Sequence, residues 1–192
     1  MKKALLVVSF GTSYHDTREK NITACERDLA ASCPDRTLFR AFTSGMIIRK
    51  LRQRDGIHID TPLQALQKLA EQGYQDVAIQ SLHIINGDEY EKIVREVQSL
   101  RPRFQRLTLG VPLLSGHGDY VQLMQALRQQ MPPLAATERV VFMGHGASHH
   151  AFAAYACLDH MMAVQGFPAR VGAVESYPEV DIVINELSRQ GV

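Results

Sequence analysis

Two stretches of sequence decide the fold: LLVVSFGTS at residues 5–13 and VVFMGHGAS at residues 140–148. Each is a short apolar run followed by small residues and glycine, which is typical of a parallel strand that is buried on both faces and ends in a tight turn. A second strand repeats as well, because AFTS at residues 41–44 matches AVES at residues 173–176. The sequence therefore predicts a duplicated strand–helix–strand unit.

Apolar runs alternate with helical patterns along the rest of the chain. Residues 77–82 and 107–111 are predicted to be further strands. Between the strands, Thr61 and Pro62 have the sequence of a helix start, and Gly73 follows that helix as a stop. Strands separated by helices predict an α/β fold with parallel sheets.

The proline pair at residues 132–133 predicts the boundary between the two halves. It follows a helix that is expected to be capped by Asp119, so the first half is predicted over residues 1–131 and the second over residues 138–192. The second half contains only two predicted strands and is therefore expected to be incomplete. Its first strand would carry an unpaired edge, which favours aggregation or pairing with another chain, including a second copy.

Composition excludes several classes of protein. The 192 residues are 45% hydrophobic and 21% charged, and 21 Lys and Arg balance 20 Asp and Glu to a net charge of +1. This is the profile of a globular chain and not of a basic nucleic-acid-binding protein. No apolar run approaches the roughly 18 residues of a membrane span. Three cysteines without a C-x-x-C pair, and no signal-peptide pattern, predict a cytoplasmic protein.

The two copies differ at the positions that directly follow their strands, where a functional site would be expected. In the alignment of the repeat, Phe10 and Thr43 of the first copy match His145 and Glu175 of the second. The carboxyl ends of parallel strands share one edge of a sheet, so the histidine and the glutamate should face one crevice. An ion about 2.1 Å from each could bridge neighbouring strands, and this donor pair suits cobalt, iron, nickel or zinc. The sequence predicts a divalent metal site here; the alternative is a loop histidine beside a surface glutamate.

Other polar residues have weaker signals. His149 and His150 are expected in the first turn of a helix capped by the preceding serine, where adjacent side chains diverge, so they are not predicted to be metal ligands. His83 and the pair Asp88–Glu89 follow the third strand, where both ligand contact and capping of the next helix remain open. His117, between two glycines, is expected in a loop.

Several familiar motifs are absent. The chain has no G-x-x-x-x-G-K-[ST] phosphate loop, and GHG at residues 144–146 lacks the third glycine of a dinucleotide fingerprint. Ser148 close to His145 raises a hydrolase alternative, but no G-x-S-x-G pattern surrounds the serine. That alternative would require an ester cleavage that His145→Ala and Ser148→Ala both abolish.

Four segments carry a resemblance to a known family: SFGTS at 9–13, QSLHIINGDEY at 80–90, MGHG at 143–146 and ESYP at 175–178. In this order they resemble the anaerobic sirohydrochlorin cobaltochelatases, which belong to the class II chelatases. The resemblance covers residues 1–192. It implies a fold of two similar α/β halves that face each other across a cleft.

The resemblance also implies an activity, that of a lyase that inserts Co²⁺ into sirohydrochlorin in anaerobic cobalamin biosynthesis without ATP. By position, His145 matches the family's metal-binding, proton-accepting histidine, and Glu175 matches its metal-binding carboxylate. No cofactor is implied beyond the divalent metal substrate, cobalt. The family's other histidine ligand follows the last helix expected in this sequence, so the resemblance implies a chain that lacks its C-terminal segment.

Sirohydrochlorin is rich in carboxylates, and the first copy offers groups that could bind it. The loop from Gly11 through Thr12 to Ser13 and the helix start at Ser44 supply N–H and hydroxyl donors. Phe10 is expected either to offer the macrocycle a flat apolar surface or to belong to the core. Two other functions stay open: insertion of Fe²⁺ into the same macrocycle for sirohaem, and an inactive module that binds the tetrapyrrole or the metal.

Overall fold

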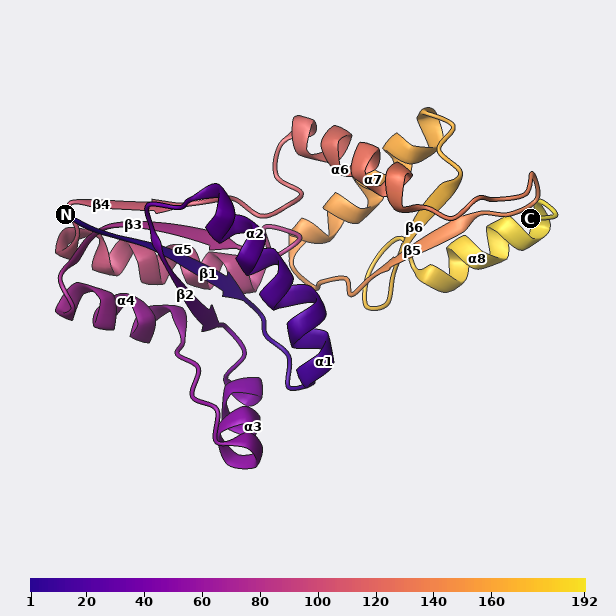
Figure 1. Cartoon of the computed structure of the whole chain (residues 1–192). Helices are drawn as coiled ribbons and strands as arrows, with labels where there is room; N and C mark the ends of the chain where they lie inside the picture. Colours follow the sequence, from indigo (N-terminus) through magenta and orange to yellow (C-terminus); the bar gives the residue numbers. More distant parts are fainter. The chain divides into compact units, whose positions relative to one another are not determined.

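The strand β1 (Lys2–Ser9) lies in the middle of an all-parallel sheet with the order β2-β1-β3-β4. The computed structural model describes all residues 1–192 and divides them into two units (Figure 1). Unit 1 comprises residues 1–84 and 88–112, and unit 2 comprises residues 85–87 and 113–192. The predicted α/β class with parallel strands is confirmed in both units.

The elements of unit 1 follow one another as β1, α1 (His15–Thr17), the π-helical turn η1 (Arg18–Thr23), α2 (Ala24–Ser32), β2 (Thr37–Phe42), α3 (Gly45–Asp55), α4 (Pro62–Glu71), β3 (Tyr74–Ser81), α5 (Asp88–Leu100), the 3-10 turn η2 (Arg101–Arg103) and β4 (Arg106–Leu109). Figure 1 shows α4 and α5 along the same face of this sheet. Their buried residues Leu66, Leu69, Ile93 and Val97 share one core with the strands. The start of α4 is a capping box, as predicted, because the Thr61 side chain accepts from the Gln64 N–H and the Gln64 side chain accepts from the Thr61 N–H.

The elements of unit 2 are α6 (His117–Gln130), β5 (Val140–Gly144), the 3-10 turn η3 (His150–Phe152), α7 (Ala153–Val164), β6 (Ala169–Ala173) and α8 (Val180–Arg189). β5 and β6 form a two-stranded parallel sheet. On one face, α7 and α6 pack against β6 residues such as Val171. On the other face, Gly172 lies under α8, where an added Cβ would sit only 2.7 Å from Val180 Cα.

The division between the units does not fall at Pro132–Pro133. The helix α6 belongs to unit 2, because its Tyr120 and Met124 are buried in one cluster with Leu158 and Met162 of α7. A helical pattern of apolar residues predicts that a helix has a buried face, but not which core covers that face.

The start of α6 also differs from the prediction. α6 begins at His117, two residues before Asp119, so His117 is helical and does not lie in a loop. The Asp119 carboxylate accepts the Gly116 N–H at 2.7 Å, which is a side-chain bond made from inside the first turn.

The hydrogen bonds at the strand ends confirm the internal repeat and correct its alignment by one residue. The Ser44 N–H donates to the Phe10 carbonyl at 3.3 Å, and the Glu175 N–H donates to the His145 carbonyl at 2.9 Å. Ser44, and not Thr43, is therefore the counterpart of Glu175. The sequence alignment superposed the small residues after each second strand, whereas the backbone hydrogen bonds of the sheet set the true register.

None of the helices combines the length and apolar character that a membrane span would need.

Candidate functional site

The tips of β5 and β6 bring His145 and Glu175 together. Gly144 and Ala173 are partners in the sheet and are the last residues of their strands. His145 follows directly, and its carbonyl accepts the Glu175 N–H at 2.9 Å. The backbone thus continues its pairing beyond the strands and holds the two Cα atoms side by side.

The side chains of this pair are close and accessible. The Nδ1 atom of His145 lies 3.6 Å from Oε2 of Glu175, and the side chains are 78% and 62% exposed. Two ligands that are each about 2.1 Å from one ion with tetrahedral angles lie about 3.4 Å apart. The pair therefore has the separation of two ligands of a single divalent ion. No cluster of three or more His, Cys, Asp or Glu side chains that could hold a metal ion is present.

Both glycines around His145 are required by close packing. Gly146 has φ +90°, and an added Cβ would lie 2.7 Å from the Ser176 hydroxyl oxygen. At Gly144, an added Cβ would lie 2.5 Å from the ring of Tyr155. The GHG sequence thus fixes the path of the chain on both sides of the histidine.

Two residues that support this loop were not predicted. The Ser176 hydroxyl accepts the Ala147 N–H at 3.3 Å, which ties the loop after β5 to the loop after β6. Tyr155 is buried against Gly144, and this burial raises the pKa of its phenol. Ser176 could have been found in the sequence, because the repeat places a serine after each second strand; nothing in the sequence marks Tyr155.

The His149–His150 pair does not lie in the first turn of an α-helix as expected. His149 has extended backbone angles and is the N-cap of η3, where its Nδ1 accepts the Ala151 N–H at 3.2 Å. The two imidazole rings do not diverge, because their centroids are 3.9 Å apart. The extended backbone at the first histidine allows the adjacent rings to lie in contact, tilted by 37°. One ring nitrogen of His149, Nδ1, is therefore used to cap the start of η3.

Phe10 and Gly11 occupy the first-copy positions that correspond to His145 and Gly146. Phe10 is 49% exposed, so the structure places this ring at the surface and not in the core. Gly11 has φ +92°, and an added Cβ would lie 2.5 Å from the Phe42 ring. The first copy therefore repeats the tight turn of the second copy but carries an apolar ring where the second carries an imidazole.

The hydroxyl groups near this turn already accept backbone hydrogen bonds. The Thr12 oxygen accepts the Tyr14 N–H at 3.2 Å, and the Ser44 oxygen accepts the Ile47 N–H at 3.4 Å as the N-cap of α3. Each hydroxyl keeps its own proton to donate. Ser13 is buried, and its carbonyl accepts a hydrogen bond from the Arg54 guanidinium.

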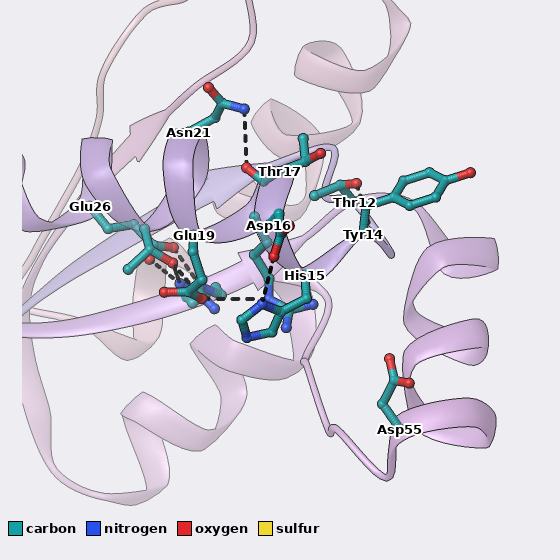
Figure 2. A network of polar contacts seen from close by, with 12 residues as sticks. Thr12, Tyr14, His15, Asp16, Thr17, Glu19, Asn21, Glu26 and Asp55 are labelled. Atoms are coloured by element: carbon teal, nitrogen blue, oxygen red, sulfur yellow. Dashed lines mark hydrogen bonds and ion pairs between the residues drawn. The ribbon is translucent and has the colours of Figure 1, made fainter.

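The chain after this turn is held by local polar contacts (Figure 2). Within it, the His15 Nδ1 lies 3.4 Å from the Asp16 carboxylate, and Asn21 donates to the Thr17 carbonyl at 3.1 Å. Further on, buried Glu26 of α2 accepts from Arg40 Nε of β2 at 2.7 Å. This ion pair anchors the helix that follows the turn to the sheet.

His83 forms a small buried polar group after β3. The Ser81 hydroxyl oxygen accepts the His83 N–H at 3.1 Å and lies within hydrogen-bond distance of His83 Nδ1, at 2.8 Å. Burial lowers the pKa of His83, and the Glu89 charge opposes this shift. His83 Nε2 and Glu89 Oε2 are both buried without a hydrogen-bond partner, whereas Asp88 is exposed.

Comparison with known proteins identifies the family. The family model described as cobalt chelatase (CbiK) matches residues 3–192. The chain is 88% identical to the sirohydrochlorin cobaltochelatase of Salmonella typhimurium, over its whole length and 73% of that protein. It is 33% identical to the sirohydrochlorin cobaltochelatase CbiKC of Nitratidesulfovibrio vulgaris, again over its whole length and 68% of that protein.

A solved structure supports the fold. SirB from Bacillus subtilis, determined with Fe³⁺, matches with a TM-score of 0.64 over 97% of this chain and 71% of its own, at 17% identity. At that identity the match shows the fold alone. The family match, together with the two relatives, shows that this chain belongs to the cobalt chelatase (CbiK) family.

Proposed function

We propose that this protein inserts Co²⁺ into sirohydrochlorin, the cobalt-inserting step of anaerobic cobalamin synthesis. The cobaltochelatase relatives support this reaction, and one observation in the structure carries its chemistry: the 3.6 Å separation of His145 Nδ1 and Glu175 Oε2 at two adjacent strand tips. Imidazole and carboxylate are suitable ligands for Co²⁺. Their exposure lets the ion arrive from solvent and leave again.

Transfer of the ion must release two pyrrole protons for each Co²⁺ that enters the macrocycle. When the ion leaves His145, the vacated imidazole nitrogen is a base and can accept one of these protons. Glu175 offsets the charge of the bound ion and can pass protons to solvent. Four macrocycle nitrogens hold the ion more strongly than two side chains do, so the reaction proceeds without ATP.

The groups proposed to bind sirohydrochlorin lie in unit 1, after β1, β2 and β3. Phe10 would contact the apolar face of the macrocycle, and the hydroxyls of Thr12 and Ser44, together with the Gly11–Ser13 backbone, would donate to its carboxylates. His83 Nε2, which has no partner within the protein, would donate to another carboxylate in the tautomer that carries its proton there.

Two acidic residues of unit 1 complete the proposed substrate contacts. Asp88 and Glu89 begin α5 and would accept hydrogen bonds from the pyrrole N–H groups. Glu89 supports this role with a buried Oε2 atom that lacks a partner.

The test is the rate of cobalt insertion, followed by the change in the absorption spectrum of sirohydrochlorin. His145→Ala should lower the rate by at least about 100-fold, since it removes both a ligand and the proton acceptor. His160→Ala is the matched control, because it removes an exposed histidine of α7. Equal rates for the wild type and His145→Ala would contradict the proposed role.

Insertion of Fe²⁺ into the same macrocycle is the second candidate. A histidine and a carboxylate accept Fe²⁺ as well as Co²⁺, so the ligand pair itself does not distinguish the two ions. Initial rates measured with each ion under anaerobic conditions decide between them. A protein that binds sirohydrochlorin with either ion but yields no metallated product would be a binding module and not a chelatase.

A further inference from the structure

The two proposed cobalt ligands are not held in place by packing of their own side chains. His145 and Glu175 are 78% and 62% exposed in their side chains. The His145 Nδ1 atom lies 3.3 Å from the carbonyl oxygen of Gly146, which belongs to the same loop. The separation of the ligands is therefore set by the two loops that carry them: the β5 loop (residues 145–149) and the β6 loop (residues 174–179).

One side chain of the β6 loop is bonded to the backbone of the β5 loop. The Ser176 hydroxyl oxygen accepts the Ala147 N–H at 3.3 Å. The two loops are in close contact here, because a Cβ added to Gly146 would lie 2.7 Å from this oxygen and 2.9 Å from the Ser176 backbone nitrogen. Together with the bond from the Glu175 N–H to the His145 carbonyl, the hydroxyl bond closes a short ring that contains both ligands.

The first copy of the repeat has no side chain at the position of Ser176. Because Glu175 corresponds to Ser44, Ser176 corresponds to Gly45. Both copies have the two backbone hydrogen bonds that continue the pairing past the strands: Thr43 to Ser9 and Ser44 to Phe10 in the first copy, and Val174 to Gly144 and Glu175 to His145 in the second. The hydroxyl bond is thus added in the copy that carries the histidine and the glutamate.

The start of the β5 loop is held by a different contact. At Gly144, which precedes His145, an added Cβ would lie 2.5 Å from the ring of the buried Tyr155 in α7. This packing fixes where the loop begins and does not involve the β6 loop. Loss of the Ser176 hydroxyl should therefore loosen the chain after His145 without unfolding unit 2.

We propose that Ser176 is a positioning residue of the cobalt site: its hydrogen bond to Ala147 holds the β5 and β6 loops at the spacing at which His145 and Glu175 bind one ion. This inference rests on the proposed function, in which these two side chains are the cobalt ligands. Two ligands bind an ion more tightly when they are already held at the required separation, because less conformational freedom is lost on binding. Without the hydroxyl bond, the ion itself must order the loops.

The test compares Ser176→Ala with Ser188→Ala, the same substitution at an exposed position of α8 in the same unit. In a titration with Co²⁺ alone, Ser176→Ala should raise the Kd about 3- to 10-fold, and Ser188→Ala should leave it unchanged. The visible absorption bands of bound Co²⁺ report the geometry of its ligands and should change in Ser176→Ala. In the metal-free protein, the Ala147 amide should exchange faster with solvent in this variant.

A second variant separates positioning from a general loss of stability. Ser176→Gly places at this position the residue that the first copy has, and it should raise the Kd for Co²⁺ in the same way. The Tm of both metal-free Ser176 variants should stay within about 4 °C of the wild type, because each loses one hydrogen bond.

Equal Co²⁺ affinity and equal absorption spectra for the wild type and Ser176→Ala would overturn the proposal. A weaker affinity that is matched by unfolding of the metal-free variants would overturn it as well, because Ser176 would then act on the fold as a whole. His145→Ala separates this failure from a failure of the proposed function. If His145→Ala also binds Co²⁺ like the wild type, the ligand pair is wrong; if only Ser176→Ala does, the ligands stand and their positioning by Ser176 is wrong.

Discussion

At the scale of single residues, Gly146 decides the geometry of the candidate metal site. It combines a left-handed backbone with a near contact to Ser176, so no side chain fits without moving the loop that carries His145. The histidine itself is exposed and makes few contacts. Its position depends on its neighbours more than on its own packing.

Gly146→Ala should therefore lower the free energy of unfolding by about 1–3 kcal/mol and also weaken Co²⁺ binding. Thermal or urea unfolding measures the first effect, and metal titration measures the second. Gly118→Ala is the matched control, because Gly118 lies in the first turn of α6 with no atom within 4 Å of an added Cβ. Gly118→Ala should leave the free energy of unfolding unchanged or slightly higher. If Gly146→Ala gave the same result, the loop that carries His145 would not be constrained by its glycine.

His83 should make stability depend on pH. Burial lowers its pKa in the folded protein below the ordinary value of about 6.5 of the unfolded chain. As pH falls through about 6.5, the unfolded state takes up a proton before the folded state does, so the free energy of unfolding decreases. Urea unfolding at pH 7.5 and 5.5 should show this loss, and His83→Gln should reduce it. An identical loss in the variant would assign the effect to other groups.

At the scale of elements, one buried carboxylate adds polar bonds to the apolar packing between α7 and β6. Asp159 is 8% exposed and accepts from Arg170 Nε at 2.8 Å, from Arg170 Nη2 at 2.9 Å and from the Val171 N–H at 2.7 Å. These bonds tie the helix to the strand whose tip leads to Glu175. The ion pair is a structural feature of unit 2 that composition alone does not reveal.

Asp159→Ala should cost about 3–5 kcal/mol of unfolding free energy, because it leaves the guanidinium and a buried N–H without their main acceptor. Chemical denaturation measures this cost. Arg95→Ala on α5 removes an exposed ion pair, with a 3.6 Å contact between Arg95 and Glu91, and should cost less than about 0.5 kcal/mol. Comparable losses in the two variants would contradict the role given to burial.

The elements that follow from local signals were predictable from sequence. Thr61 and Pro62 predict the start of α4 because capping involves only neighbouring residues, and the apolar runs predict β1 and β5 for the same reason. The assignment of α6 to unit 2 and the alignment of Glu175 with Ser44 depend on contacts between residues that are distant in the sequence, so local patterns did not predict them. The ring contact between His149 and His150 depends on a single extended residue, and no pattern in the sequence marks it.

The candidate site was predictable in part. The repeat drew attention to His145 and Glu175, and the structure brings them together as the parallel-strand argument requires. The hydrogen bond between Ser81 and His83 and the support from Tyr155 needed the structure, because both arise from the folding of loops.

At the scale of the whole molecule, bound metal should raise stability. An ion that binds the folded chain at His145 and Glu175 stabilises it by mass action, by about 2.7 kcal/mol when free Co²⁺ is 100 times its Kd. Adding Co²⁺ should therefore raise Tm, and a chelator should reverse the shift. Glu175→Gln should reduce the shift strongly. A shift that is unchanged in Glu175→Gln would place the stabilising ion elsewhere.

The matching backbone at the two pairs of strand tips has a consequence for engineering. Because Phe10 corresponds to His145 and Ser44 to Glu175, the double substitution Phe10→His and Ser44→Glu would graft the same donor pair onto unit 1. The graft would cost about 1 kcal/mol for the lost N-cap of α3. Each unit would then carry a histidine and a glutamate at corresponding strand tips. The Co²⁺ affinity of the new pair, compared with that of His145 and Glu175, would show how much of the affinity depends on backbone geometry alone.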